Sequence, residues 1–202
     1  GVYTGSPIRE ELKNGDPERA KALLRFDDPS KPTVLCMGGS MGAVAINRIL
    51  RKALPDLAQT FNIVHLCGTG NLDPALNGHE SYRQLEFAGS ELPDLFALSD
   101  IALSRAGANA VFELVCLSLP ALLVPLPSAS SRGDQDQNAD YFARRGCFEV
   151  VPQSELTPEL LHEKLRLLYQ NRESYATHMQ AQGLSDSLSS IIALIEQYAR
   201  VR

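Results

Sequence analysis

Residues 99–127 read SDIALSRAGANAVFELVCLSLPALLVPLP, and this stretch decides the fold. It contains an apolar run at 101–103, a small polar turn at 104–107, a run with helical spacing at 108–117 and a second apolar run at 121–126. A strand, a tight turn, a helix and another strand form a βαβ unit with parallel strands. Because open α/β sheets bind ligands beyond the carboxyl ends of their strands, residues 104–107 are expected at a binding edge.

The turn and the helix after it have the features of a phosphate site. Gly107 and Ala108 place almost no side chain over the start of the helix. A helix start offers free N–H groups and a partial positive charge. Glu113 follows about one and a half turns later, where a carboxylate suits two hydroxyls of a sugar beside the phosphate, as an acidic residue does for ribose in dinucleotide folds. The alternative is that Glu113 is only a solvated residue on the helix surface.

Strands and helices alternate on both sides of this stretch. Further strands are expected at 33–37, 61–67, 82–87 and 148–151, and helices at 16–26, 43–53, 92–98 and 134–145. The alternation predicts an α/β fold with a Rossmann-like parallel sheet of about six strands flanked by helices. We expect one domain over residues 1–202, with a helical segment at 157–202 in which Thr157 is the N-cap and Pro158 the first helical residue.

Size and composition exclude several classes of protein. The chain has 202 residues, of which 44% are hydrophobic and 21% charged, as is ordinary for a globular protein. A net charge of -5 without a long basic run argues against nucleic-acid binding. No apolar stretch reaches membrane-spanning length, and the first residues do not resemble a signal peptide. Because the chain opens abruptly on a strand-like segment, GVYTGSPIR, we expect it to be a fragment of a longer protein.

The cysteines and histidines show no metal-binding spacing. The cysteines lie in or beside apolar runs without a C-x-x-C pair, at Cys36, Cys67, Cys116 and Cys147. They are expected to be buried and reduced. His65 lies near the end of a strand and is expected to be structural. No metal ion and no cofactor are therefore predicted.

A second turn, residues 38–42 with the sequence GGSMG, also follows a predicted strand. It lacks the G-x-G-x-x-G pattern and the acidic residue of a dinucleotide site, and it has no P-loop lysine. What remains is a glycine-rich turn that places the hydroxyl of Ser40 at a helix start, which suits an anion. The alternative is a tight turn that needs glycine for its backbone conformation.

A third turn, residues 128–139 with the sequence SASSRGDQDQNA, follows the strand at 121–126. Its amide and acidic side chains, at residues 134–138, suit sugar hydroxyls. The alternative is a polar loop with Asp134 as the helix N-cap, and both can hold together. The three turns lie along one edge of one sheet, and together they provide an anion site, a diol acceptor and amides, as a nucleoside diphosphate sugar requires.

These motifs, in this order and spacing, resemble the C-terminal half of the two-domain GT-B glycosyltransferases. Within that fold the chain is most similar to the peptidoglycan enzymes that add N-acetylglucosamine to lipid I to make lipid II. The resemblance rests on TGSPIR at 4–9, GGSMG at 38–42, residues 104–113 with LPA at 119–121, and DQ and NA within 134–139. Two positions depart from the family pattern: Ser6 stands where asparagine is usual, and Met41 where a polar residue is usual.

The resemblance implies a role for each matching residue. Arg9 and Ser40 would contact the diphosphate or the sugar near it, and the backbone of Ala88 would contact uracil. Glu113 would accept the ribose hydroxyls, and Gln135, supported by Asn138, would bind the N-acetylglucosamine hydroxyls. The helix start under the phosphates would comprise Gly107, Ala108, Asn109, Ala110, Val111 and Phe112.

The resemblance further implies a hexosyltransferase whose sugar donor is UDP-N-acetylglucosamine. Its acceptor, the lipid-linked muramoyl-pentapeptide, and its catalytic base would belong to an N-terminal half that this chain lacks, so the chain alone is not expected to transfer sugar. Peripheral association with the cytoplasmic face of the bacterial cell membrane is implied for the full-length enzyme. The alternatives are another GT-B transferase, such as a diacylglycerol glycosyltransferase, a sugar-nucleotide epimerase of the same fold, and a nucleotide-binding module without catalysis.

Overall fold

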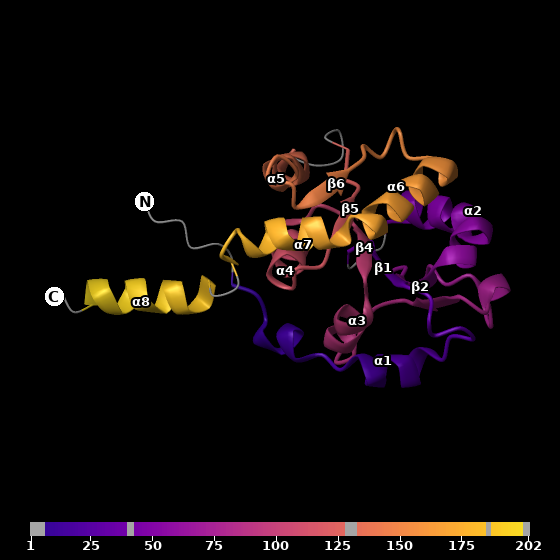
Figure 1. Ribbon diagram of the computed structural model, residues 1–202, viewed down its shortest axis with the longest axis horizontal. Coiled ribbons are helices and arrows are strands. Elements are labelled where there is room, and N and C mark those ends of the chain that lie inside the picture. Colours follow the sequence, from indigo (N-terminus) through magenta and orange to yellow (C-terminus); the bar gives the residue numbers. More distant parts are fainter. Residues whose placement is uncertain (1–6, 40–42, 128–132, 185–186, 200–202) are drawn as a thin grey trace.

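A computed structural model describes residues 7–39, 43–127, 133–184 and 187–199 (Figure 1). Its centre is a six-stranded sheet of order β3-β2-β1-β4-β5-β6, in which every neighbouring pair is parallel. The strands are β1 (Thr33–Met37), β2 (Asn62–Leu66), β3 (Tyr82–Leu85), β4 (Ile101–Ser104), β5 (Ala121–Leu123) and β6 (Phe148–Val150). The predicted fold class, a Rossmann-like parallel sheet flanked by helices, is confirmed.

Helices cover both faces of the sheet because its strands are apolar on both sides (Figure 1). In β1, Val34 and Cys36 join one core while Leu35 joins the other, as the period of two along a strand requires. The first core includes α2 (Val44–Thr60) and α6 (Pro158–Gln170). The second includes α1 (Pro17–Leu24), α3 (Leu92–Leu98), α4 (Ala108–Cys116), α5 (Asp134–Ala143) and α7 (Arg172–Gln180).

The order of the strands positions the binding edge. β1 and β4 are neighbours, and their register runs from Val34 opposite Ile101 to Met37 opposite Ser104. The turns that follow β1 and β4 therefore begin at the same level. From β1 the chain continues to β2 on one side, whereas β4 leads to β5 on the other. Such a topological switch point opens a crevice at the carboxyl ends of the strands.

The N-terminal segment is attached to α3, and its residue Arg9 lies beside the binding edge. A 3-10 helix, η1 (Glu10–Asn14), precedes α1 and was not among the expected elements. Asp94 of α3 accepts hydrogen bonds from the backbone N–H of Asp16 at 2.7 Å and from Arg19 Nη2 at 2.8 Å. A Cβ at Gly15 would lie 2.0 Å from the carbonyl oxygen of Pro93, so only glycine allows this close approach.

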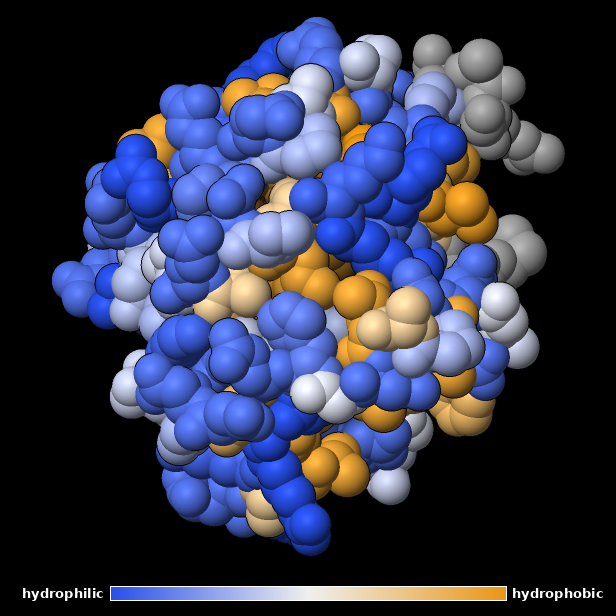
Figure 2. Space-filling model, turned by 90° about the vertical axis from the view of Figure 1, so that its right-hand side faces the viewer, coloured by the Kyte–Doolittle hydropathy of each residue, from blue (hydrophilic) through white to orange (hydrophobic). Residues whose placement is uncertain are grey.

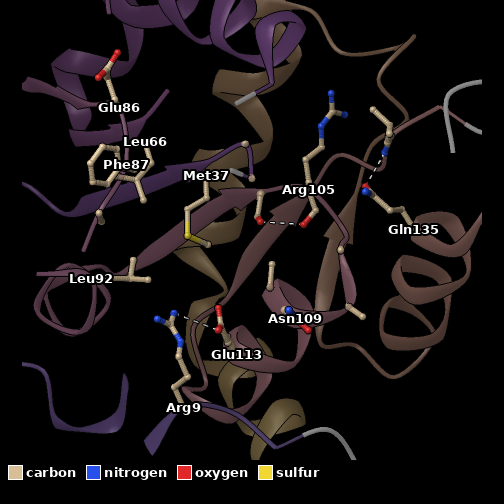
Figure 3. Close-up of a pocket in the computed structure, with 18 residues that line it drawn as sticks. Arg9, Met37, Leu66, Glu86, Phe87, Leu92, Arg105, Asn109, Glu113 and Gln135 are labelled. Carbon is tan, nitrogen blue, oxygen red and sulfur yellow. Dashed lines mark hydrogen bonds and ion pairs between the residues drawn. The ribbon is translucent and has the colours of Figure 1, made fainter. Parts of the chain in front are cut away.

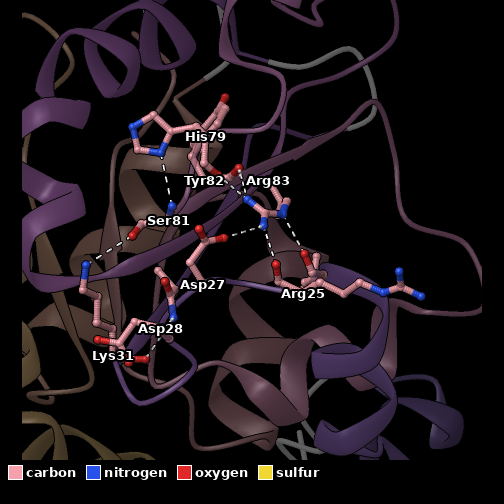
Figure 4. Close-up of polar contacts among 10 residues, drawn as sticks. Arg25, Asp27, Asp28, Lys31, His79, Ser81, Tyr82 and Arg83 are labelled. Atoms are coloured by element: carbon pink, nitrogen blue, oxygen red, sulfur yellow. Dashed lines mark hydrogen bonds and ion pairs between the residues drawn. The ribbon is translucent and has the colours of Figure 1, made fainter.

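Arg83 of β3 ties the end of α1 to the sheet (Figure 4). It donates from Nε to the carbonyl of Leu24 at 2.6 Å and from Nη2 to the carbonyl of Arg25. Lys31, on the loop that leads into β1, donates to the carbonyl of Ala58 at 2.8 Å and to Ser81 Oγ at 3.3 Å. The segment before β1 is thus held at both ends of its loop.

Two elements end three or more residues away from the expected position, and the others end within two residues of it. β5 ends at Leu123 rather than at 126, because Pro125 has no N–H with which to continue the ladder. α2 continues to Thr60 rather than to residue 53, although it contains Pro55. The turns beyond Pro55 bury Leu57 and Ala58 against the sheet, and this burial offsets the cost of proline inside a helix.

His65 is structural, as predicted. Its Nε2 lies 2.9 Å from Asn47 Oδ1, and its Nδ1 lies 2.7 Å from the hydroxyl of Tyr82. Burial lowers the pKa of His65 to about 3, so the imidazole is neutral near pH 7. The cysteines are all free thiols; Cys36, Cys67 and Cys147 are buried as expected, whereas Cys116 is only half-buried.

Two faces of the molecule differ in character. α8 (Ser187–Ala199) lies apart from the sheet in Figure 1 and exposes Ile192, Ile195 and Tyr198. The opposite, right-hand face of Figure 1 is predominantly hydrophilic, with apolar side chains showing mainly between polar ones (Figure 2). In the described part of the chain, no helix combines the length and the apolar character that crossing a bilayer requires.

Candidate functional site

A cavity of about 890 Å³ opens at the carboxyl ends of the strands (Figure 3). Its wall is formed by the residues that end or follow β1, β2, β3 and β4, by the first turn of α4 and by Gln135 of α5. Arg9, from the N-terminal segment, closes one side. The cavity therefore lies at the edge where the sequence predicted a binding site, and it joins segments that are far apart in the chain.

The start of α4 forms the floor of this cavity. Gly107 is the N-cap, and Gly107, Ala108, Asn109 and Ala110 line the cavity. Because the first N–H groups of a helix have no partner within it, they can bind an anion there.

Val111 and Phe112 were also expected to belong to the phosphate site at the helix start, but they do not line the cavity. The N–H of Val111 donates to the carbonyl of Gly107 at 3.0 Å, and its side chain is fully buried in the core. The ring of Phe112 packs edge-on against Phe142 of α5, with 5.6 Å between the ring centroids. These two residues anchor the helix, while the residues before them face the cavity.

Glu113 also lines the cavity, and its carboxylate lies 3.5 Å from Arg9 Nη2 (Figure 3). The side chain of Glu113 is 18% exposed, and that of Arg9 is 52% exposed. Burial raises the pKa of Glu113 above its usual value, and the charge of Arg9 acts in the opposite direction. Glu113 is therefore not a freely solvated helix residue, and the structure brings together two of the predicted site residues.

Gln135 lines the cavity from the start of α5. Its Oε1 accepts a hydrogen bond from the N–H of Leu126 at 2.9 Å, so its amide group can donate on the other side. Asn138 does not line the cavity. It donates from Nδ2 to the carbonyl of Ala106 at 3.1 Å and so holds α5 against the turn between β4 and α4.

The prediction that Asp134 caps α5 is wrong. The N-cap is Gly133, whose φ of 80° lies in the left-handed region, and Asp134 is the first helical residue. Glycine adopts this conformation without steric cost, so the chain enters the helix one residue earlier than the capping pattern indicated. A carboxylate in the first turn remains favourable next to the helix dipole.

Of the remaining predicted site residues, one lines the cavity and one lies outside the described part of the chain. Ala88 lines the cavity just beyond β3. Ser40 lies outside the described residues, as do residues 4–6 and Met41. Its neighbours Gly38 and Gly39 line the cavity, and Gly39 has a φ of 87°.

Several cavity residues were not among the sequence predictions. Most of them share a position at or just beyond the end of a strand, namely Met37, Leu66, Glu86, Phe87 and Arg105, and Leu92 starts α3. That position was the available signal, since parallel strands end at one edge. Arg105 is the most unusual of them, because only 9% of this charged residue is exposed. Among the described residues, no cluster of three His, Cys, Asp or Glu side chains could hold a metal ion.

Residues 33–195 match the glycosyltransferase family 28 C-terminal domain. The chain belongs to this family. It is 49% identical, over 98% of its length, to the UDP-N-acetylglucosamine--N-acetylmuramyl-(pentapeptide) pyrophosphoryl-undecaprenol N-acetylglucosamine transferase of Geobacillus thermodenitrificans (strain NG80-2). The chain spans 56% of that relative, so it corresponds to little more than half of the curated protein.

The family 28 domain is also similar to solved structures. MurG from Acinetobacter baumannii superposes with a TM-score of 0.74 at 26% identity, over 98% of this chain and 57% of that one. The calicheamicin glycosyltransferase CalG4 superposes with a TM-score of 0.67 at 20% identity, over 87% of this chain and 45% of that one. The second likeness shows a shared fold only. The predicted resemblance to GT-B glycosyltransferases is confirmed.

Proposed function

We propose that this chain is the sugar-donor-binding half of an N-acetylglucosaminyltransferase. Its donor is UDP-N-acetylglucosamine, and the acceptor of the full-length enzyme is the lipid-linked muramoyl-pentapeptide of peptidoglycan synthesis, so that lipid I becomes lipid II. The observation that carries the proposal is that the start of α4, Glu113 and Gln135 all line the same cavity. The identity of 49% to a transferase of that name supports the choice of donor and acceptor.

Each part of the donor has a place in this cavity. Ala88 contacts uracil through its backbone at one end, and Glu113 accepts the ribose hydroxyls. The diphosphate lies over the start of α4, whose N–H groups and dipole favour negative charge, with Ser40 and Arg9 as further contacts. Gln135 donates to the hydroxyls of N-acetylglucosamine, and Asn138 keeps α5 in place for it.

The chemistry that this half supplies is stabilisation of the leaving group. As the bond between the sugar and the diphosphate breaks, negative charge grows on the diphosphate, and the prearranged N–H groups of α4 stabilise it. Transfer also needs an acceptor hydroxyl held in line with the anomeric carbon and a base within reach of that hydroxyl. We assign those tasks to the part of the relatives that this chain does not span. The chain alone is thus expected to leave lipid I unconverted.

The place of action follows from the proposed acceptor. A lipid-linked acceptor stays in the membrane, so the full-length enzyme would associate with the cytoplasmic face of the bacterial cell membrane as a peripheral protein. In that arrangement this half brings the soluble nucleotide sugar to the membrane surface.

Two alternatives keep the same fold. A diacylglycerol glycosyltransferase would differ in its acceptor, whereas a sugar-nucleotide epimerase would need an acid and a base beside the sugar. The carboxylates that line the described cavity are Glu86 and Glu113. Glu86 accepts from the N–H of Gly70 at 2.5 Å, and Glu113 pairs with Arg9. Because Glu86 is held by a backbone N–H and Glu113 is assigned to the ribose, neither of these carboxylates is left to act on the sugar, and a transferase is favoured over an epimerase.

Calorimetric titration of the chain tests the donor. We expect UDP-N-acetylglucosamine to bind with micromolar to millimolar affinity, roughly −8 to −4 kcal/mol, and more tightly than UDP-glucose. The measurement is repeated with a chelator, which is expected to leave the affinity unchanged. No heat at millimolar ligand would overturn the proposal, and equal affinity for the two sugars would overturn the assignment of N-acetylglucosamine alone.

A further inference from the structure

A second cavity, of about 380 Å³, lies beside α2. None of its described lining residues belongs to the proposed donor cavity (Figure 3). α2 contributes Arg48, Arg51 and Lys52, and the segment after β2 contributes Asn71 and Asp73. α2 lies on the right-hand side of Figure 1, the side that Figure 2 shows to be predominantly hydrophilic. With three cationic side chains against one carboxylate, the described lining of this cavity is positively charged.

The spacing of the three cations places them on one side of α2. Arg51 and Lys52 follow Arg48 by three and four residues, the separations at which side chains are neighbours on a helix surface. Ile46 and Leu50 belong to the opposite side, which is buried in the core. In the described part of the chain, no carboxylate forms an ion pair with any of the three cations. Because like charges at these separations destabilise a helix, the arrangement gains nothing from α2 itself.

Arg51 is held in place by neutral groups. It is half-buried, and its Nη2 donates to the carbonyl of Asn71 at 2.5 Å and to Gln84 Oε1 at 3.2 Å. Its Nε is buried without a hydrogen-bond partner in the described part of the chain. Because arginine stays protonated in proteins, its charge is fixed in position but not neutralised. An anion would therefore meet a cation that loses little freedom on binding.

The segment after β2 keeps its shape without help from the other two cations. Gln84 of β3 accepts a hydrogen bond from the N–H of Asp73 at 2.9 Å and donates to the carbonyl of the same residue at 2.6 Å. The carboxylate of Asp73 accepts at 3.1 Å from an N–H of the short helix η2 (Pro74–Leu76), which it caps. The side chains of Arg48 and Lys52 are exposed and form no hydrogen bond or ion pair with the rest of the described chain. The contacts of the fold thus do not use either charge.

We propose that this cavity is a second anion site, which binds a phosphate group independently of the donor. Guanidinium and ammonium groups form charge-assisted hydrogen bonds with phosphate oxygens, and a fixed arginine adds directional geometry. The volume is near the lower end of the range of about 300–1,000 Å³ for small-molecule pockets, so it suits a phosphate or a diphosphate. The phosphate is either free in solution or part of a phospholipid head group. The inference goes beyond the proposed function, because the two cavities have no described lining residue in common.

NMR titration with inorganic pyrophosphate tests this site. The chain is first saturated with UDP, so that the donor cavity is filled, and pyrophosphate is then added at constant ionic strength. We expect the backbone amides of residues 44–52 and 71–73 to shift together with one dissociation constant, while those of residues 107–110 keep their UDP-bound positions. Should UDP not bind, the proposed function fails, but the shifts of residues 44–52 and 71–73 still report on this site.

Two double variants identify the groups that bind. Arg48→Gln with Lys52→Gln removes the two exposed cations of the cavity and keeps the hydrogen bonds of Arg51. The control, Lys21→Gln with Arg166→Gln, removes one lysine and one arginine from exposed positions on α1 and α6. We expect the first variant to raise the dissociation constant of pyrophosphate about tenfold and the control to change it less than about twofold. UDP affinity should be unchanged in both.

Vesicles identify the source of the phosphate. Vesicles that contain phosphatidylglycerol are compared with vesicles of phosphatidylcholine alone in a sedimentation assay. Binding of pyrophosphate assigns the site to a soluble phosphate. Binding to the phosphatidylglycerol vesicles alone, weakened when Arg48 and Lys52 are replaced, assigns it to a head group. The inference is wrong if neither ligand binds, or if the variant without Arg48 and Lys52 binds as tightly as the wild-type chain.

Discussion

At the scale of single residues, the ion pair of Arg9 and Glu113 links two side chains that the proposed function assigns to different parts of the donor. The pair is long, at 3.5 Å, and Arg9 is half exposed, so it holds the carboxylate only weakly. Ribose hydroxyls that approach Glu113 can therefore share or replace this contact. Because Glu113 must be ionised to accept both hydroxyls, its protonation should control binding.

Replacing Glu113 by glutamine tests this dependence on pH. The folded-state pKa of Glu113 lies above its usual value of 4.5, so the carboxylate becomes protonated as the pH falls through that raised value. UDP affinity should decline over the same range in the wild-type chain. Glu113→Gln should bind UDP about tenfold more weakly near pH 7, because charge-assisted hydrogen bonds are lost, and should lack this part of the decline.

The control for this experiment is Glu163→Gln, which changes an exposed carboxylate on α6. Its UDP affinity should follow that of the wild-type chain at every pH, so that the titration of UDP itself cancels in the comparison. If Glu113→Gln binds UDP as tightly as the wild-type chain at neutral pH, the carboxylate of Glu113 does not contribute to UDP binding.

At the scale of elements, the attachment of η1 to α3 decides where Arg9 lies. Gly15→Ala should destabilise the chain by about 1–3 kcal/mol, as overpacking commonly does, because its Cβ would meet the backbone of Pro93 at 2.0 Å. Gly89→Ala is the matched control, since the nearest atom to its Cβ is a side-chain oxygen of Glu91 at 3.4 Å. Urea unfolding measures both, and equal midpoints would show that the segment can move aside without cost.

Elements with a local sequence pattern could be predicted from the sequence, whereas features that depend on distant contacts could not. The alternation of apolar runs and glycine turns was enough to predict the strands and their binding edge, because each signal is local. η1 was missed, since its five residues have no apolar period of their own and pack through Leu12 against distant parts of the chain. Arg105 was missed for a similar reason: its burial depends on residues 124, 125 and 153, which lie far away in the sequence.

At the scale of the whole molecule, the cavity draws on almost every part of the sheet's carboxyl edge. It takes residues from the ends of β1, β2, β3 and β4, from the start of α4 and α5, and from the N-terminal segment. A ligand bound there would therefore connect the half of the sheet formed by β1, β2 and β3 with the half that contains β4, β5 and β6. Binding to the folded state alone must then stabilise the entire domain.

UDP should accordingly raise the melting temperature of the chain. A ligand at a hundred times its dissociation constant adds about 2.7 kcal/mol to the free energy of unfolding. For a domain of this size each kcal/mol raises the melting temperature by about 2–4 °C, so we expect a shift of roughly 5–10 °C. Differential scanning calorimetry at several UDP concentrations measures it, with uridine at equal concentration as the control. Since the proposed diphosphate contacts are at the start of α4 and in the turn after β1, uridine should give a much smaller shift. Equal shifts would mean that the phosphates contribute little and that the cavity recognises the nucleoside alone.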